Sequence, residues 1–377
     1  MIKKVLALFI FCDLCLIAQT ARAVDWYDCC SWGYRKKITI DYTKVSTSDL
    51  SYFAVLINTT DVAWKDTSNG GHVGQSDGGD ILFTSSNGVT KLDHEIEKYT
   101  ATTGELVAWV EVPTVSASAN TVIYIYYGNA TCADQWNING TWNEGGTASI
   151  KGVWHLKEDP SGTAPQIIDS TSYANNGTSA GSMTTGDQVP GQIGGSLDFD
   201  GSNDDIAIPD ATCFDIYTNL TISVWVKWTK TVDATQQMVV ARSTNWRFGA
   251  QPGSSLWAFF APSPYPGWVP ISGTALSQNA WHYMVFTYTG ATSTIYKDGS
   301  SWIEQSATGN LGVDQGIYFG GWTASTYFGG IADEIRIYNR AVGPSEIKTT
   351  YNNQSSPSTF YSVSWEEING DFFLLFE

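Results

Sequence analysis

The chain has 377 residues, of which 42% are hydrophobic, 14% aromatic and 15% charged, and its formal net charge is −17. This length suffices for two or three domains, and the aromatic residues and 36 glycines favour pleated sheets joined by tight turns. The negative charge argues against nucleic acid and anionic membranes as partners, and it suits either solubility alone or the binding of cations. The composition therefore predicts an all-β protein.

The first 23 residues have the parts of a secretory signal peptide. Two lysines precede an apolar run over 5–17, and the Ala-Arg-Ala motif at 21–23 fits the cleavage pattern. The apolar run is too short to span a bilayer comfortably. We therefore expect a secreted or cell-surface protein with no membrane span, whose mature chain begins near Val24.

Four cysteines remain after the predicted signal peptide: Cys29, Cys30, Cys132 and Cys213. An exported protein can oxidise them, and four cysteines allow three connectivities. Neighbouring cysteines do not readily pair with each other. Among the other pairings, a disulfide from Cys29 or Cys30 to Cys132 would close the first domain end to end.

Residues 24–135 are predicted to form a first antiparallel β-sandwich. Alternating or continuous apolar runs are separated by turns rich in glycine and asparagine, which is typical of small sandwiches. The predicted strands lie at 36–42, 53–58, 80–84, 92–99, 105–112 and 121–127.

The same unit contains recurring phrases. They are W-x-x-R-K-x-I-x-I at 32–40, D-I-x-F-T at 80–84, L-x-H-E-I-E-x-Y at 92–99, A-W-V-x-V-P at 108–113 and I-Y-Y-G-N at 125–129. Together they resemble an uncharacterised family that precedes lectin-like domains in exported, mostly prokaryotic proteins. The resemblance implies a domain boundary and no particular activity.

Residues 136–150 are rich in Asn, Gly, Thr and Trp without apolar periodicity, so we interpret them as a linker. The second domain is predicted at 151–351, with one short helix at 344–348. Residues 352–377 form a C-terminal tail, which either adds a last strand at 360–365 or stays partly disordered.

The second domain contains a series of strand-like phrases. They are SLDFDGS at 196–202, TISVWVKW at 221–228, WHYMVFTY at 281–288, IYKDG at 295–299 and GGIADEIRIYNR at 329–340. In this order they resemble the laminin-G-like, concanavalin A-like jelly-roll family. The resemblance implies two antiparallel sheets that hold a glycan or a protein partner at a loop rim.

Carboxylates and amides gather around the glycine-rich turns of this domain, and Ca²⁺ takes six to eight such oxygen ligands. The resemblance implies an ion between an early loop and the final strand, which points first to Asp169 and Asp333. We predict a structural calcium ion bound by Asp169, Asp200 and Asp333. The alternative is that these side chains cap turns by accepting hydrogen bonds from nearby backbone.

Aromatic residues in Gly-, Pro- and Ser-rich segments are candidates for a sugar platform, because aromatic rings stack on the apolar faces of sugars. The predicted ligand-binding residues are Trp246, Trp257, Tyr265, Trp268 and Trp322. The alternative is that these rings cover a sheet edge.

Asp93, Glu95 and Glu97 alternate, so all three should point to one face of a strand. Positions two apart on a strand are separated by about 6.5 Å, close to the roughly 5–5.5 Å between the two carboxyls of a retaining glycosidase. A solvated strand face has the same pattern, and we assign no catalytic residue. The four histidines show no metal-binding spacing.

These features predict an exported carbohydrate-binding or adhesion protein of two β-sandwich domains. Its expected partners are a glycan or extracellular polymer, with surface proteins as further partners. The first alternative is a structural or protein-interaction module of an envelope or surface assembly without glycan affinity. A glycoside hydrolase is the second alternative.

Overall fold

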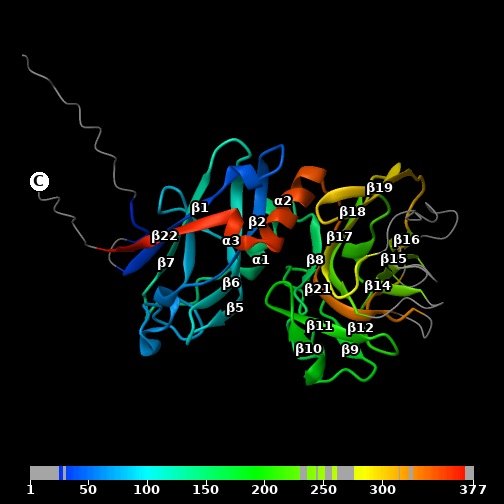
Figure 1. The fold of residues 1–377 in the computed structure, drawn as a ribbon, viewed down its shortest axis with the longest axis horizontal. Coiled ribbons are helices and arrows are strands. Elements are labelled where there is room, and N and C mark those ends of the chain that lie inside the picture. The colour runs from blue at the N-terminus through cyan, green and yellow to red at the C-terminus, as the bar shows by residue number, and fades with distance from the viewer. Residues whose placement is uncertain are drawn as a thin grey trace, which may run out of the picture.

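The computed structural model describes residues 25–28, 31–229, 236–242, 245–250, 276–313, 315–321 and 326–369, together with the backbone of 257–260. The predicted signal peptide, Cys29 and Cys30 lie outside the described residues, and Cys132 and Cys213 are free thiols. The protein is nearly all-β and consists of two β-sandwiches arranged side by side (Figure 1). Among the described residues, none of the helices has the length and apolar character needed to cross a membrane.

The first sandwich packs a five-stranded sheet against a three-stranded one. Its strands are β1 (Tyr34–Ile40), β2 (Leu50–Thr60), β3 (Leu82–Ser85), β4 (Lys91–Leu92), β5 (His94–Thr100), β6 (Glu105–Val115), β7 (Thr121–Tyr127) and β22 (Tyr361–Ile368). The larger sheet has the order β22-β1-β7-β3-β4 and the smaller one β2-β6-β5. Short 3₁₀ turns lie between strands: η1 (Tyr42–Lys44), η2 (Val62–Trp64) and η3 (Thr67–Asn69).

The end of the chain returns to the first sandwich. Strand β22 pairs antiparallel with β1, with Tyr34 opposite Ile368 and Ile40 opposite Tyr361, and Figure 1 shows it beside the first strand. Residues 361–368 of the predicted tail are therefore part of the first sheet, so this sandwich takes strands from both ends of the chain.

The second sandwich is a jelly roll with a larger and a smaller sheet. Its strands are β8 (Ile150–Trp154), β9 (Thr178–Ala180), β10 (Gln188–Pro190), β11 (Gly195–Asp200), β12 (Asp205–Ile208), β13 (Leu220–Trp228), β14 (Gln237–Arg242), β15 (Trp246–Ala250), β16 (Trp257–Phe260), β17 (Trp281–Tyr288), β18 (Thr292–Lys297), β19 (Ser300–Ser306), β20 (Ile317–Phe319) and β21 (Gly329–Tyr338). One sheet runs β10-β11-β21-β13-β17-β18-β19, with β8 also paired to β21, and the other runs β16-β15-β14-β20-β12-β9. Two 3₁₀ turns, η5 (Thr185–Asp187) and η6 (Thr212–Phe214), belong to its loops.

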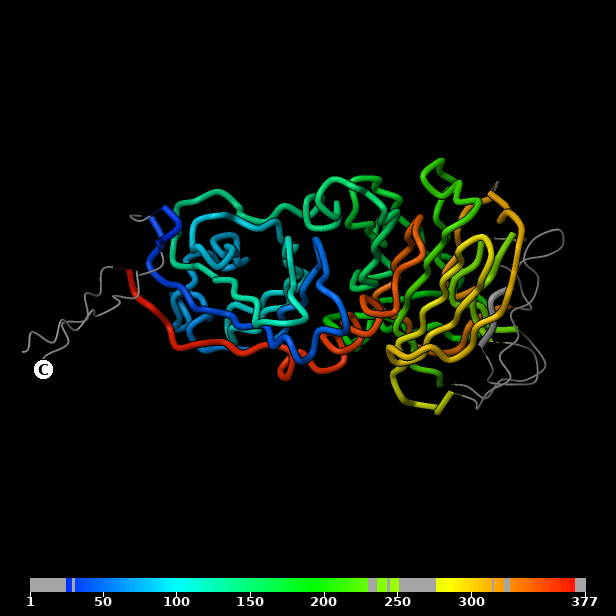
Figure 2. The backbone as a smooth tube through the Cα atoms, turned by 90° about the horizontal axis from the view of Figure 1, so that it is seen from above, coloured from blue at the N-terminus to red at the C-terminus, as the bar shows by residue number. Residues whose placement is uncertain are grey.

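The segment between the sandwiches, predicted as a linker, is folded. It contains α1 (Ile138–Thr141) and η4 (Glu144–Gly146), and it buries Trp142, which is 2% exposed. The remaining helices are α2 (Pro344–Ser355), longer than the predicted helix at 344–348, and α3 (Pro357–Phe360). Figures 1 and 2 show α2 next to the junction, on the way back to the first sandwich.

The two sandwiches meet through the outer faces of their sheets, because alternate residues of a strand point to opposite sides. On β6, Leu106 and Ala108 face the core of the first sandwich, whereas Trp109 faces the junction. On β13, Val224 faces the core of the jelly roll, whereas Trp225 faces the junction. The apolar side chains that meet there include Leu56, Val107, Trp109, Trp142, Val153, Ile193, Trp225, Tyr283 and Ile347.

Helix α2 fastens this junction through two amide side chains. Asn353 accepts a hydrogen bond from the backbone N–H of Leu56 at 2.7 Å and donates one to its carbonyl at 3.0 Å. This pair satisfies both backbone groups at a position where β2 is the edge of its sheet. Gln354 accepts a hydrogen bond from Nε1 of Trp225 at 2.6 Å, so one helix contacts both sandwiches.

Acidification is expected to destabilise the first sandwich through His94, which is buried against Phe83 and bonded through Nε2 to the carbonyl of Ile81 at 3.0 Å. Burial lowers the pKa of His94 from 6.5 to about 4. The unfolded chain therefore takes up this proton first, and stability falls as the pH drops below 6.5.

This single group should remove about 3 kcal/mol of unfolding free energy by about pH 4. Urea unfolding of the wild type and of His94→Gln, each at neutral pH and at about pH 4, measures the effect. The variant has no group to protonate at this position and should lose about 3 kcal/mol less over that range. Equal losses in both proteins would contradict the prediction.

Candidate functional site

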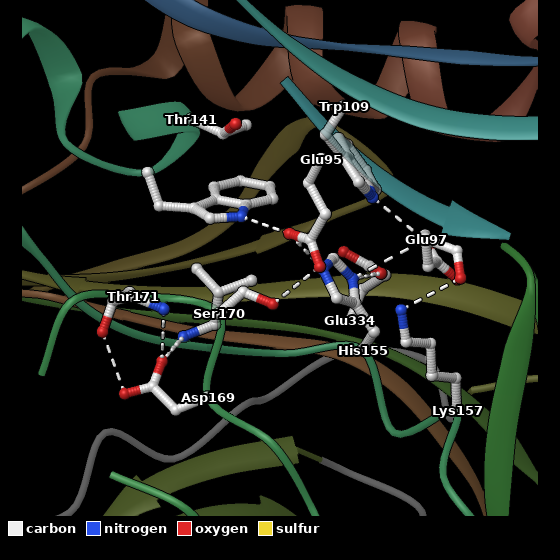
Figure 3. Close-up of polar contacts among 12 residues, drawn as sticks. Glu95, Glu97, Trp109, Thr141, His155, Lys157, Asp169, Ser170, Thr171 and Glu334 are labelled. Carbon is white, nitrogen blue, oxygen red and sulfur yellow. Dashed lines mark hydrogen bonds and ion pairs between the residues drawn. The ribbon is translucent and has the colours of Figure 1, made fainter. Parts of the chain in front are cut away.

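A buried charged centre lies at the junction of the sandwiches and consists of Glu95, Glu97, His155 and Glu334 (Figure 3). Glu95 and Glu97 belong to β5, His155 follows β8, and Glu334 lies on β21. His155 Nε2 lies 3.2 Å from Glu95 Oε2, and its Nδ1 lies 2.5 Å from Glu334 Oε1 and 3.6 Å from Glu97 Oε2. One imidazole therefore contacts carboxylates from both domains.

Two irregularities in the strands bring these carboxylates together. The pairing of β5 with β6 shifts between Ile96 and Lys98, so Glu97 is an extra residue that has no partner in the register. The pairing of β21 with β13 also shifts, and Glu334 there has a positive φ of 54°. Neighbouring Asp333 and Glu334 are consequently both buried at 1% exposure or less.

Donors from both domains orient the two glutamates of β5. Trp142 Nε1 donates to Glu95 Oε2 at 2.6 Å, and Ser170 Oγ donates to Glu95 Oε1 at 2.9 Å. Trp109 Nε1 donates to Glu97 Oε2 at 2.9 Å. Each carboxylate is therefore fixed in direction by a buried donor, as Figure 3 shows.

Arg336 completes the charged centre. Its guanidinium donates to Glu334 Oε2 at 2.7 Å and lies over the rings of Trp109 and Trp142, with Cζ at 4.4 and 4.7 Å from the ring centroids. Such cation–π contacts strengthen when water is excluded. The arginine is thus held between the two sandwiches in one orientation.

The charges of the centre shift one another's pKa. Burial raises the pKa of Glu95, but the charge of His155 and hydrogen bonds outweigh it and lower the pKa to about 2. Burial raises the pKa of Glu97 to about 7, against the opposing charge of His155. Burial and the charge of Glu334 hold the pKa of Asp333 well above its usual range. Burial lowers the pKa of His155, but the three glutamates outweigh it and raise the pKa.

Three of these residues have donor atoms placed for a metal ion. One oxygen of Glu97, one of Glu334 and a nitrogen of His155 all lie within 4.8 Å of one another. Nitrogen and carboxylate oxygen ligands in this combination suit divalent transition metals.

An open cleft of about 540 Å³, which we call the junction cleft, lies beside the charged centre. Its lining comes from β5, from α1 and the segment before it, and from the loops that follow β8. The polar and aromatic lining residues include Glu95, Trp136, Asn137, Asn139, Lys157 and Asn176. A second cleft of about 420 Å³ is lined by Glu97, Lys157 and Gly194 among others.

Of the predicted calcium ligands, Asp169 acts as a turn cap. Its Oδ1 accepts hydrogen bonds from the N–H groups of Val153 and Thr171 at 3.0 and 2.9 Å. Its Oδ2 accepts from the hydroxyl of Thr171 and the N–H of Asn175, both at 2.9 Å. These contacts correspond to the capping alternative.

The other two predicted ligands also accept backbone hydrogen bonds. Asp200 Oδ1 accepts from the N–H groups of Ser202 and Asn203. Asp333 Oδ2 accepts from the N–H of Ile193 at 2.9 Å, whereas its buried Oδ1 has no hydrogen-bond partner among the described residues.

The structure does not bring the three aspartates to one point. Asp200 is opposite Gly329 on β21, and Val153, which donates to Asp169, is opposite Arg336 on the same strand. Seven positions along a strand correspond to roughly 20 Å. Calcium binding by these residues therefore stays a prediction, and it would require separate ligand sets.

The predicted sugar platform is described at one position. Trp246 is 3% exposed and belongs to the core of the jelly roll, where it packs with apolar side chains. Tyr265, Trp268 and Trp322 lie outside the described residues, as does the side chain of Trp257.

The carboxylates weighed as catalytic have separate surroundings. Asp93 accepts a hydrogen bond from Asn137 at 2.9 Å near the start of α1, whereas Glu95 and Glu97 meet His155. Sequence reasoning missed His155 as their partner and missed the cleft residue Trp136. The sequence did contain a signal for each residue. His155 lies in the phrase that opens the second domain, and Trp136 lies in an Asn-rich segment.

Comparison with protein families supports the two-part layout. Residues 200–348 match the family model of the Concanavalin A-like lectin/glucanases superfamily. Residues 77–148 match the model of a domain of unknown function (DUF2341). The two resemblances inferred from the sequence phrases are thereby confirmed. No curated protein matches this chain.

Solved structures similar to this chain include domain 4 of AbnA, a GH43 extracellular arabinanase from Geobacillus stearothermophilus, with 19% identity, a TM-score of 0.43, and coverage of 54% of this chain and 98% of that domain. The binding domain of Paraclostridial Mosquitocidal Protein 1 has 16% identity, a TM-score of 0.42, and coverage of 54% and 52%. The botulinum neurotoxin serotype D binding domain has 15% identity, a TM-score of 0.42, and coverage of 55% and 52%. The chain thus spans about half the length of these toxin domains.

Asp169→Asn is expected to destabilise the protein by about 2 kcal/mol, because an amide cannot accept at both oxygens and leaves buried donors unpaired. Asp200→Asn, at a half-buried turn, should cost less than about 1 kcal/mol. Urea unfolding in calcium and in EDTA measures both effects. A loss for Asp169→Asn that appears only in calcium would show metal ligation in place of turn capping.

Proposed function

We propose that this chain is an exported carbohydrate-binding or adhesion protein that recognises an extracellular or cell-surface glycan. The observation that carries the proposal is the junction cleft, in which the half-buried Trp136 lies with amide, ammonium and carboxylate side chains. Its volume of about 540 Å³ is in the usual range for small-ligand sites.

The chemistry of the junction cleft suits a sugar. The Trp136 ring offers an apolar surface for the C–H face of a pyranose or furanose. Asn137, Asn139 and Asn176 supply both donors and acceptors for hydroxyl groups, and Lys157 supplies a charged donor. The match of residues 200–348 to a lectin and glucanase superfamily supports the same ligand class.

Recognition without hydrolysis fits the state of the two glutamates better than catalysis does. Glu95 and Glu97 are 3% and 6% exposed, each accepts a hydrogen bond from an indole N–H, and both face His155. A glycosidase needs one carboxyl in contact with the leaving oxygen and one at the anomeric carbon. These side chains are instead occupied in the junction.

The first experiment is a glycan array with the secreted protein in calcium and in chelator, followed by titration of the best ligand. Trp136→Ala should weaken binding about fivefold, because stacking of an aromatic ring contributes on the order of 1 kcal/mol. The matched control is Trp365→Ala on β22, which removes a tryptophan that is 94% exposed. That variant should bind as the wild type does.

Each outcome has a meaning. If Trp136→Ala and the wild type bind a glycan with equal affinity, the junction cleft is not the binding site. That result would favour the aromatic residues predicted from sequence, such as Trp268. Cleavage of a glycan by the protein would show that its function is hydrolysis and not recognition alone. No binding to any glycan would favour the structural or protein-interaction alternative, with surface proteins as partners.

A further inference from the structure

The two ring nitrogens of His155 differ in the number of carboxylates that they contact. Nε2 lies 3.2 Å from Glu95 Oε2 and meets one carboxylate, so it carries a hydrogen and donates. Nδ1 faces two carboxylates, Glu334 at 2.5 Å and Glu97 at 3.6 Å. A single proton on Nδ1 balances one negative charge, whereas a divalent cation balances both.

The hydrogen bonds around His155 resemble those that usually surround a metal-binding histidine. A metal-ligating histidine usually donates its other N–H to a carboxylate, which fixes the ring and its tautomer. Glu95 supplies that carboxylate and is itself held by Trp142 and Ser170.

The two carboxylates that face Nδ1 are held in the same manner. Glu97 accepts a hydrogen bond from Trp109, and Glu334 accepts one from Arg336. Each of the three ligand side chains is therefore oriented by a group outside the three.

Carboxyl groups outnumber basic groups around this point. Five carboxyl groups interact electrostatically with His155, and two fixed cations, Arg336 and Lys157, face them. The five are Glu95, Glu97, Glu158, Asp333 and Glu334. Moreover, Glu97 Oε1 and Asp333 Oδ1 are buried without a hydrogen-bond partner among the described residues, a costly state unless a cation is close.

We propose that Glu97, His155 Nδ1 and Glu334 bind a divalent transition-metal ion such as Zn²⁺, which joins the two sandwiches. The proposal does not rest on the glycan-binding function. It is a new site, made from one residue of the first sandwich and two of the second.

The distances agree with such an ion after a small adjustment. Zinc bonds of about 2.0–2.2 Å in tetrahedral geometry place neighbouring donor atoms about 3.4 Å apart. The separation of Nδ1 from Glu97 Oε2 is 3.6 Å, and the 2.5 Å contact with Glu334 Oε1 opens by about 1 Å when the ion enters. Glu97 Oε1 provides a further oxygen on the same side chain.

The ligand set selects the metal. Ca²⁺ and Mg²⁺ prefer all-oxygen shells, whereas imidazole nitrogen with carboxylates suits Zn²⁺ or its first-row neighbours. The second cleft of about 420 Å³ is lined by Glu97, although the Glu97 side chain itself is fully buried. Gly194 packs against this carboxylate, because a Cβ at that position would lie 1.9 Å from Glu97 Oε1.

The test uses the full protein without a histidine tag, stripped with EDTA and then exchanged into chelator-free buffer. Zn²⁺, Mn²⁺, Ca²⁺ and Mg²⁺ are added separately, bound metal is measured by mass spectrometry after gel filtration, and Tm is recorded. We expect one equivalent of retained Zn²⁺ and a Tm higher by several degrees, because a ligand that binds only the folded state stabilises it.

Glu97→Gln keeps the shape of the side chain and should lose the retained zinc and the rise in Tm, as should His155→Gln. The matched control is His282→Gln, which removes a histidine paired with Asp298 at 2.9 Å elsewhere in the jelly roll and should leave zinc binding unchanged. Absence of retained zinc and of any Tm change in the wild type, which needs no variant to fold, would overturn the proposal. Equal zinc retention by the wild type and Glu97→Gln would overturn it as well.

Discussion

The contact between His155 of the jelly roll and the glutamates of β5 determines how the two sandwiches sit against each other. A charged group removed from water is tolerated only when partners and hydrogen bonds surround it. Here the partners come from both domains, since His155 and Glu334 belong to the second and Glu95 and Glu97 to the first. A shift of one sandwich would leave several buried charges without partners, so the charged centre specifies one relative position, while the apolar side chains around it supply the burial.

The same contact explains why β5 and β6 are buried on both faces where they pass the charged centre. In the phrase at 92–99, His94 points into the first sandwich against Phe83, and Glu95 points out into the junction. On β6, Trp109 points outward beside the centre and donates to Glu97. Alternation of polar and apolar residues on these strands therefore separates two buried environments, an apolar core and a polar junction. The polar face would be solvated only if the second sandwich were absent.

Local patterns predicted many of the strands, and the recurring sequence phrases pointed to the two domain families. The predicted strands at 121–127 and 281–288 coincide with β7 and β17, because their β-branched and aromatic runs are bounded by turn residues. Pairings between distant segments were not predictable: β22 joins β1 across more than three hundred residues, and Glu95 meets a histidine sixty positions away. Nothing in a local pattern distinguishes a carboxylate that faces water from one that faces another domain.

The proposed glycan site and the proposed ion have residues in common. Glu95 lines the junction cleft and accepts from His155, and Lys157 lines both clefts while its Nζ donates to the carbonyl of Glu97 at 2.9 Å. A ligand in the junction cleft would thus contact the groups that orient the imidazole. An ion on Nδ1 would in turn restrict the motion of the side chains that line the cleft. Coupling of this kind is reciprocal, because any stabilisation that one ligand gives the other is returned in equal measure. The proposed recognition site and the proposed ion would therefore share one connected network of hydrogen bonds.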